Sequence, residues 1–172
     1  LAVGERVVVN GNFKIDSAMQ IAGKQSMMSA PEKENLAQLS TESQDLLSHL
    51  YADYLKLQKS LAADDLKGAR GVFSQLRNQV NQIDKTAGHI PDTWKKMNTK
   101  FLTNISPEFD KQSISELRAS FENASILVLG LQREYGHTDD QMLYEVFCPM
   151  AFDNKGAYWL QTDRQVKNPY FG

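Results

Sequence analysis

The sequence has very little of the two side chains that most often build disulfides and zinc sites. Its 172 residues include one cysteine, Cys148, and three histidines. A single cysteine excludes an intramolecular disulfide framework. The scattered histidines match neither a catalytic triad nor the familiar zinc spacings, and no glycine-rich phosphate loop is present. We therefore predict a protein that is not an enzyme.

The chain also lacks a surplus of positive charge and a long apolar run. Its 19 Lys and Arg residues face 21 Asp and Glu residues, which gives a net charge of −2. Without a basic surplus, neither nucleic acid nor an anionic lipid surface is expected as a partner. No apolar stretch approaches the roughly 20 residues that a membrane-spanning helix needs. With 41% hydrophobic and 23% charged residues, the composition is ordinary for a globular protein.

The N-terminal residues differ in pattern from the rest. Residues 3–9 are rich in β-branched side chains and precede Asn10-Gly11, a strong turn pair, which predicts a short β-strand. A lone strand is not stable, so its partners must lie elsewhere in the chain or in a missing N-terminal part. Pro31 and the charged run 32–34 indicate a linker. We predict one part over residues 1–30 and a helical domain with a C-terminal knuckle over residues 31–172.

Four segments carry apolar residues at spacings of three and four, the period of an amphipathic helix. They cover residues 46–61, 66–83, 94–105 and 114–135. Because the connections between them are short, neighbouring helices should be antiparallel. The sequence thus predicts a mostly α protein built on an antiparallel four-helix bundle.

Helix boundaries are predicted from capping residues. Thr41 with Gln44 and Ser113 with Glu116 fit the capping box, in which the first side chain binds a backbone N–H three residues on. Asp64-Asp65 offers a start for the second helix, Pro91 suits the first turn of the third, and Gly136 suits the end of the fourth.

A small hairpin is expected after the last helix. Residues 143–147 and 157–160 are rich in aromatic and branched side chains, and residues 153–156 form a plausible turn between them. The first run is short, so Leu143 could instead prolong a helix. Either way, a knuckle forms between the two runs.

Within this knuckle stands Cys148-Pro149-Met150. Proline fixes its φ near −65°, so a stiff bend limits how the two sulfurs can be arranged. A thiolate and a thioether are the soft ligands that suit a monovalent metal such as Cu(I) or Ag(I). The alternative is that Cys148 is a small buried hydrophobe and that Met150 fills a gap beside it.

Two sulfurs leave such an ion short of ligands, so a third should come from elsewhere. The candidates are His49, Met142 and His137. Each has an alternative role: His49 as a half-exposed residue at the edge of the first helical stripe, His137 as a solvated loop residue, and Met142 in core packing. We predict Cys148, Met150, His49 and Met142 as the metal-binding set.

Both ends of the chain resemble one family. Cys148-Pro149-Met150, then residues 156–160, then Asn168-Pro169-Tyr170-Phe171-Gly172 resemble a helical domain that is often fused to periplasmic adaptors of heavy-metal efflux systems. The segment 4–17 resembles the strand and turn that close the membrane-proximal region of CusB-like membrane-fusion proteins. The two matches cover some forty residues. In this family the tail usually continues to a second Met and Cys, beyond Gly172.

The resemblance implies a part in copper or silver export across the cell envelope. Such an adaptor lies in the periplasm and bridges an inner-membrane resistance–nodulation–division pump to an outer-membrane channel. It can also receive the metal itself, with methionines as usual ligands. Membrane association would then come from missing parts of the full chain.

Two other functions fit the same residues. The helical domain could be a structural docking module, in which the knuckle only packs the tail against the helices. The chain could also be a free-standing periplasmic metallochaperone, although the β segment at residues 3–9 then lacks partners. Burial of the Cys148 sulfur without a second ligand nearby would favour the docking module.

Overall fold

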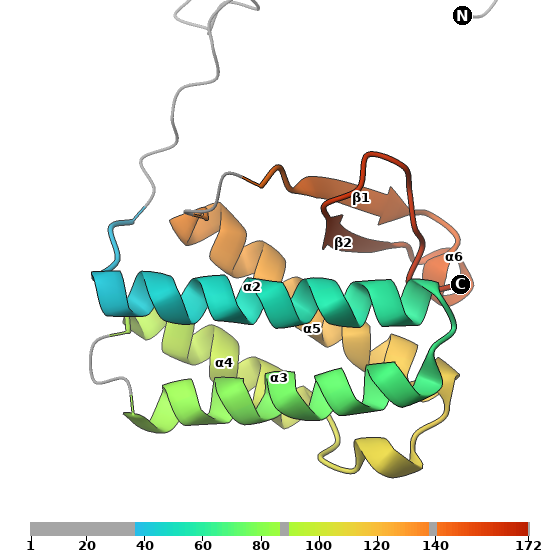
Figure 1. The fold of residues 1–172 in the computed structure, drawn as a ribbon, viewed down its shortest axis with the longest axis horizontal. Helices are drawn as coiled ribbons and strands as arrows, with labels where there is room; N and C mark the ends of the chain where they lie inside the picture. The colour runs from blue at the N-terminus through green and yellow to red at the C-terminus, as the bar shows by residue number, and fades with distance from the viewer. Residues whose placement is uncertain (1–36, 87–89, 138–140, 172) are drawn as a thin grey trace, which may run out of the picture. The chain divides into compact units, whose positions relative to one another are not determined.

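The computed structural model describes residues 37–86, 90–137 and 141–171 (Figure 1). The predicted strand at residues 3–9 and the predicted boundary after residue 30 lie outside these ranges. Within them the chain is mostly helical and carries one two-stranded antiparallel sheet. The elements are α2 (Thr41–Ala62), α3 (Leu66–Thr86), α4 (Asp92–Asn104), η1 (Phe109–Lys111), α5 (Ile114–Tyr135), β1 (Tyr144–Cys148), α6 (Ala151–Asn154) and β2 (Ala157–Gln161).

The capping residues explain where α2 begins and where α5 begins and ends. Ser113 accepts a hydrogen bond from the Glu116 N–H, and the Glu116 carboxylate accepts one from the Ser113 N–H, so the predicted capping box of α5 is confirmed. Gly136 ends α5 with a φ of 68°, a value that favours glycine. The predicted box of Thr41 and Gln44 is wrong. Ser40 is extended and its hydroxyl accepts from the Ser43 N–H, so Thr41 is already helical.

The capping box of α5 makes stability depend on pH. Hydrogen bonds from the Ser113 N–H and hydroxyl lower the pKa of Glu116 below its ordinary value of 4.5. Because the folded-state pKa of Glu116 is depressed, this stabilisation is fully present when the pH is above the unfolded-state pKa. It is lost as the pH falls through the folded-state pKa. We expect Glu116→Gln to lower the thermal unfolding midpoint at about pH 6, with a gap to the parent that narrows towards about pH 3. Parallel curves for the two proteins would contradict the assignment.

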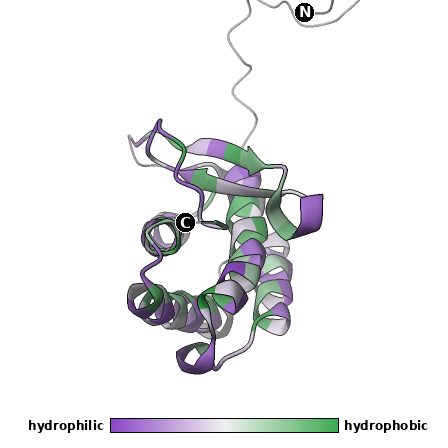
Figure 2. Ribbon diagram, turned by 90° about the vertical axis from the view of Figure 1, so that its right-hand side faces the viewer, coloured by the Kyte–Doolittle hydropathy of each residue, from purple (hydrophilic) through white to green (hydrophobic). Residues whose placement is uncertain are grey.

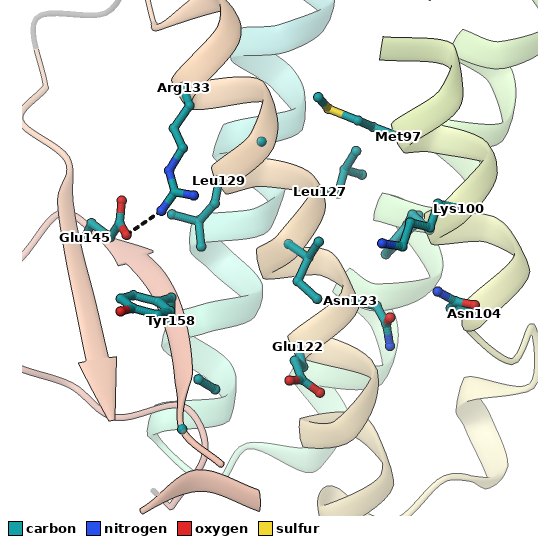
Figure 3. Close-up of a pocket in the computed structure, with 15 residues that line it drawn as sticks. Met97, Lys100, Asn104, Glu122, Asn123, Leu127, Leu129, Arg133, Glu145 and Tyr158 are labelled. Carbon is teal, nitrogen blue, oxygen red and sulfur yellow. Dashed lines mark hydrogen bonds and ion pairs between the residues drawn. The ribbon is translucent and has the colours of Figure 1, made fainter. Parts of the chain in front are cut away.

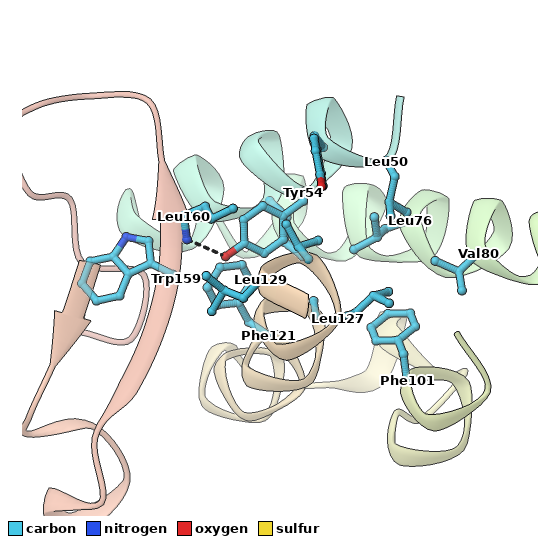
Figure 4. Packing of buried hydrophobic residues seen from close by; sticks show 14 of the residues in the cluster. Leu50, Tyr54, Leu76, Val80, Phe101, Phe121, Leu127, Leu129, Trp159 and Leu160 are labelled. Atoms are coloured by element: carbon cyan, nitrogen blue, oxygen red, sulfur yellow. Dashed lines mark hydrogen bonds between the residues drawn. The ribbon is translucent and has the colours of Figure 1, made fainter. Parts of the chain in front are cut away.

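Helix α5 lies at the centre of the described unit and is buried on two sides. Leu127, Val128 and Leu129 are consecutive and all buried, which a single amphipathic stripe does not produce. Figure 4 shows the reason: Leu127 points towards Phe101 of α4, whereas Leu129 points towards the hairpin. The helices and the hairpin therefore share one hydrophobic core through α5.

The hairpin packs on α5 and α2, on the side away from α3 (Figures 1 and 2). The predicted pairing is confirmed: Glu145 lies opposite Leu160 and Phe147 opposite Tyr158. Leu143 precedes β1 and belongs to no helix. The outer edge of β2 is closed by side chains, because the Leu160 N–H donates to the Tyr54 hydroxyl at 3.1 Å and the Tyr170 hydroxyl donates to the Tyr158 carbonyl at 3.0 Å.

Candidate functional site

The knuckle between β1 and β2 is a left-handed turn. Phe152, Asp153 and Asn154 have φ values of 52°, 56° and 66°, and Gly156 follows at 80°. Hydrogen bonds from the Gly156 N–H to the Ala151 carbonyl and from the Lys155 N–H to the Phe152 carbonyl close it. Each left-handed non-glycine residue costs about 1–2 kcal/mol. Packing against the rest of the domain must therefore hold this turn in place.

The two sulfur residues of the knuckle differ in exposure. Cys148 ends β1 opposite Ala157 and is 8% exposed, whereas Met150 is 66% exposed. Proline between them lets the chain turn outward immediately after the strand. The thiol is thus enclosed while the thioether faces solvent. Cys148 belongs to the hydrophobic core, and Met150 fills no gap beside it. This burial of Cys148 is the outcome that favours the docking module.

The C-terminal tail returns to the knuckle. Tyr170 packs edge-on against Phe152 and Trp159, with ring centroids 5.4 and 5.8 Å away. Burial raises the pKa of the Tyr170 phenol well above its usual range. Together with Met150, residues 151–154, Phe171, Ser115 and Arg118, Tyr170 lines a hollow of about 480 Å³.

Arg118 of α5 fastens this tail. Its guanidinium donates to the Pro169 carbonyl at 3.0 Å, to the Leu61 carbonyl at 3.2 Å and to the Asp64 carboxylate at 2.6 Å. Gln58 adds a bond to the Lys167 carbonyl at 2.7 Å. The tail therefore lies where α2 ends and α5 begins. Sequence reasoning missed Arg118, because the carbonyls that it binds belong to residues far away in the sequence, and no local pattern around an arginine on a helix predicts them.

The other predicted ligands lie away from the knuckle. His49 is exposed in the first half of α2, about 20 Å along the helix from its end at Ala62. Met142 is 69% exposed and precedes β1, whose extended residues separate it from Cys148 by more than about 13 Å. Cys148 at the end of β1 and Met150 in the following turn are neighbours in the sequence, and the structure brings neither His49 nor Met142 to them.

His137 is held by its neighbours. Its Nε2 lies 2.9 Å from the Gln141 carbonyl, which can only accept, so Nε2 carries the proton. Nδ1 then accepts from the Gln132 amide at 2.9 Å. Both ring nitrogens are therefore engaged. Among the described residues, no group of three or more His, Cys, Asp or Glu side chains is placed to hold a metal ion.

A second candidate site is a cleft of about 650 Å³ between α4, α5 and the hairpin (Figure 3). Its floor is α5, where Ile126 is 52% exposed. Lys100 of α4 and Tyr158 of β2 stand on opposite walls, and Arg133 pairs with Glu145 at 2.7 Å on the side of Tyr158. The sequence pattern did not predict this cleft, because three separate elements must meet to form it.

No family model, curated protein or solved structure was found that matches this chain. Among the described helices, none is both long enough and apolar enough to cross a membrane.

Proposed function

We propose that the chain is the C-terminal part of a periplasmic adaptor in a copper- or silver-type heavy-metal efflux system, and that its knuckle binds the soft metal through Cys148 and Met150. One observation carries the proposal: a buried thiol and an exposed thioether stand on either side of one proline, where β1 passes into the knuckle. These are the ligands that a monovalent coinage metal prefers over harder donors. The family resemblance of the two chain ends supports the same assignment.

The tail lies close to the knuckle. Tyr170 and Phe171 line the same hollow as Met150. In the family that the chain resembles, the tail goes on to a second Met and Cys. His49 and Met142 are too distant to supply a third ligand, so among the described residues the proposed site rests on the two sulfurs of the knuckle.

Metal transfer would proceed by ligand exchange, without bond-making on a substrate. The exposed Met150 thioether would meet the incoming ion first, and the Cys148 thiol would then lose its proton and bind as thiolate. Burial of Cys148 limits access of water and of competing thiols. By the resemblance, the onward acceptors are the inner-membrane pump and the outer-membrane channel.

The helical part would serve as the frame of this site. We infer that α2, α3, α4 and α5 form an antiparallel four-helix bundle. Direct packing of α2 with α3, α3 with α4, α4 with α5 and α2 with α5 supports that arrangement. A docking function of the frame is a second candidate, favoured by the cleft in which Ile126 is exposed.

Titration with Ag(I), a redox-stable substitute for Cu(I), tests the metal proposal. We expect one site in the reduced protein, and we expect Cys148→Ser or Met150→Leu to weaken it at least tenfold, because each removes one of the two sulfurs. Met142→Leu is the matched control, since Met142 and Met150 are 69% and 66% exposed. Equal binding by Met150→Leu and Met142→Leu would refute the knuckle site and favour the docking module. So would Zn(II) binding as tight as Ag(I) binding.

A further inference from the structure

No described residue pairs with the outer edge of β1, in contrast to that of β2. On β2, the Leu160 N–H and the Tyr158 carbonyl both point away from β1, towards Tyr54 and Tyr170. In an antiparallel ladder, a residue whose backbone groups point outward lies opposite one whose groups also point outward. Since Glu145 pairs with Leu160 and Phe147 with Tyr158, the N–H and carbonyl groups of Glu145 and Phe147 point to the outer edge of β1.

These four groups have no hydrogen-bond partner among the residues that the structure describes. Exposed edges are usually protected by lysine, proline or a bulge. Between Tyr144 and Cys148 the strand has none of these. Its single charge, Glu145, is engaged by Arg133 at 2.7 Å. The rings of Phe147 and its cross-strand partner Tyr158 pack at a tilt, with centroids 4.5 Å apart, and the two residues are 45% and 48% exposed. The edge is therefore suited to receive another strand.

The sequence of β1 allows a second copy of the same strand to pair with it in one register. Two copies of β1 can pair antiparallel only in registers that place outward-pointing residues opposite each other. Centring on Glu145 sets two like charges face to face, which is destabilising. Centring on Phe147 sets Glu145 opposite Pro149, which has no N–H to donate. Centring on Val146 sets each Glu145 opposite Phe147 of the second copy and lets both pairs exchange two hydrogen bonds.

We propose that two copies of this chain form a two-fold dimer in which their β1 strands pair antiparallel about Val146. The two hairpins then become one four-stranded sheet, joined by four backbone hydrogen bonds. Each Glu145 keeps its Arg133 and meets an aromatic ring of the second copy rather than a charge. This dimer requires no metal, so its test is independent of the metal-binding function proposed above.

Disulfide trapping tests the register. In this dimer the two Val146 residues form a non-hydrogen-bonded pair, whose Cα atoms lie about 4.5 Å apart, within the range that a disulfide spans. In a Cys148→Ser background, we expect Val146→Cys to form covalent dimers with diamide at least tenfold faster than Ile126→Cys. The control residue is 52% exposed and lies off the edge, on α5, whereas Val146 is half-buried. A Val146→Cys rate equal to or below that of the control would overturn the proposal.

Amide hydrogen exchange on the metal-free parent chain supplies an independent test that needs no substitution. We expect protection of the Glu145 and Phe147 amides to rise with protein concentration. The Val146 amide, which lies in the β1–β2 ladder, and the Leu160 amide, which donates to Tyr54, should be protected at every concentration. Sedimentation should show a monomer–dimer equilibrium over the same range. A monomer at all concentrations would refute the dimer and leave the edge to a different protein.

Discussion

Replacing Phe121 with alanine should lower the free energy of unfolding by about 3–5 kcal/mol, the usual cost of deleting a buried aromatic ring. Phe121 is fully buried on α5. Its ring stacks on Tyr54 of α2 with centroids 5.2 Å apart and lies 5.6 Å from Tyr170 of the tail. The substitution would open a cavity where the helices, the hairpin and the tail meet, so all three should lose stability together.

Denaturant unfolding measures this effect. Phe171→Ala is the matched control, because Phe171 is 54% exposed in the tail and surface substitutions usually change stability by about 0.5 kcal/mol or less. Far-UV circular dichroism and tryptophan fluorescence should give the same midpoint in Phe121→Ala, since Trp94 lies in α4 and Trp159 in β2. Losses of similar size in the two variants would show that Phe121 does not join the parts.

The sequence predicted the helices of the described unit well, because α2, α3 and α4 each bury one face. Helix α5 is different, since the hairpin covers a second side of it and Leu127, Val128 and Leu129 are all buried. The sequence period predicted the inner stripe of α5 but not the second contact. The exposed Ile126 follows from the same geometry, because it projects into the cleft between the two covered sides.

The candidate site was predictable only where it is local in sequence. Cys148, Pro149 and Met150 are neighbours, so their common turn follows from proline and from the hairpin. The distances of His49 and Met142 from that turn depend on how α2 and β1 are placed in the fold, which no spacing encodes. The role of Gln161 is likewise not predicted by any sequence spacing. Gln161 is buried, and its side-chain amide donates hydrogen bonds to the carbonyls of Asp163 and Gln165, which shapes the loop before the tail.

Replacing Arg118 with methionine should lower the free energy of unfolding by about 2–3 kcal/mol, because carbonyls that accept from a charged group lose their donor. The side chain is only 15% exposed, and methionine retains much of its apolar packing. The ion pair with Asp64 contributes little, since that carboxylate is 65% exposed. Arg118→Lys is the control: it keeps the charge but cannot reach the Leu61 and Pro169 carbonyls together. We expect its denaturant midpoint to fall between those of the parent and Arg118→Met.

The same variant tests whether the tail belongs to the proposed metal site. Arg118 bears no sulfur, yet it fastens Pro169 and lines the hollow that contains Met150 and Phe171. If the tail encloses the metal site, Ag(I) affinity should fall at least severalfold in Arg118→Met, measured where the protein is still folded. If Cys148 and Met150 act without the tail, affinity should remain at the parent value. Weakened Ag(I) binding in Arg118→Met, with normal binding in Met142→Leu, would place the tail in the site. Arg118 has no sulfur ligand of its own, so it can affect the metal only by holding the tail in place.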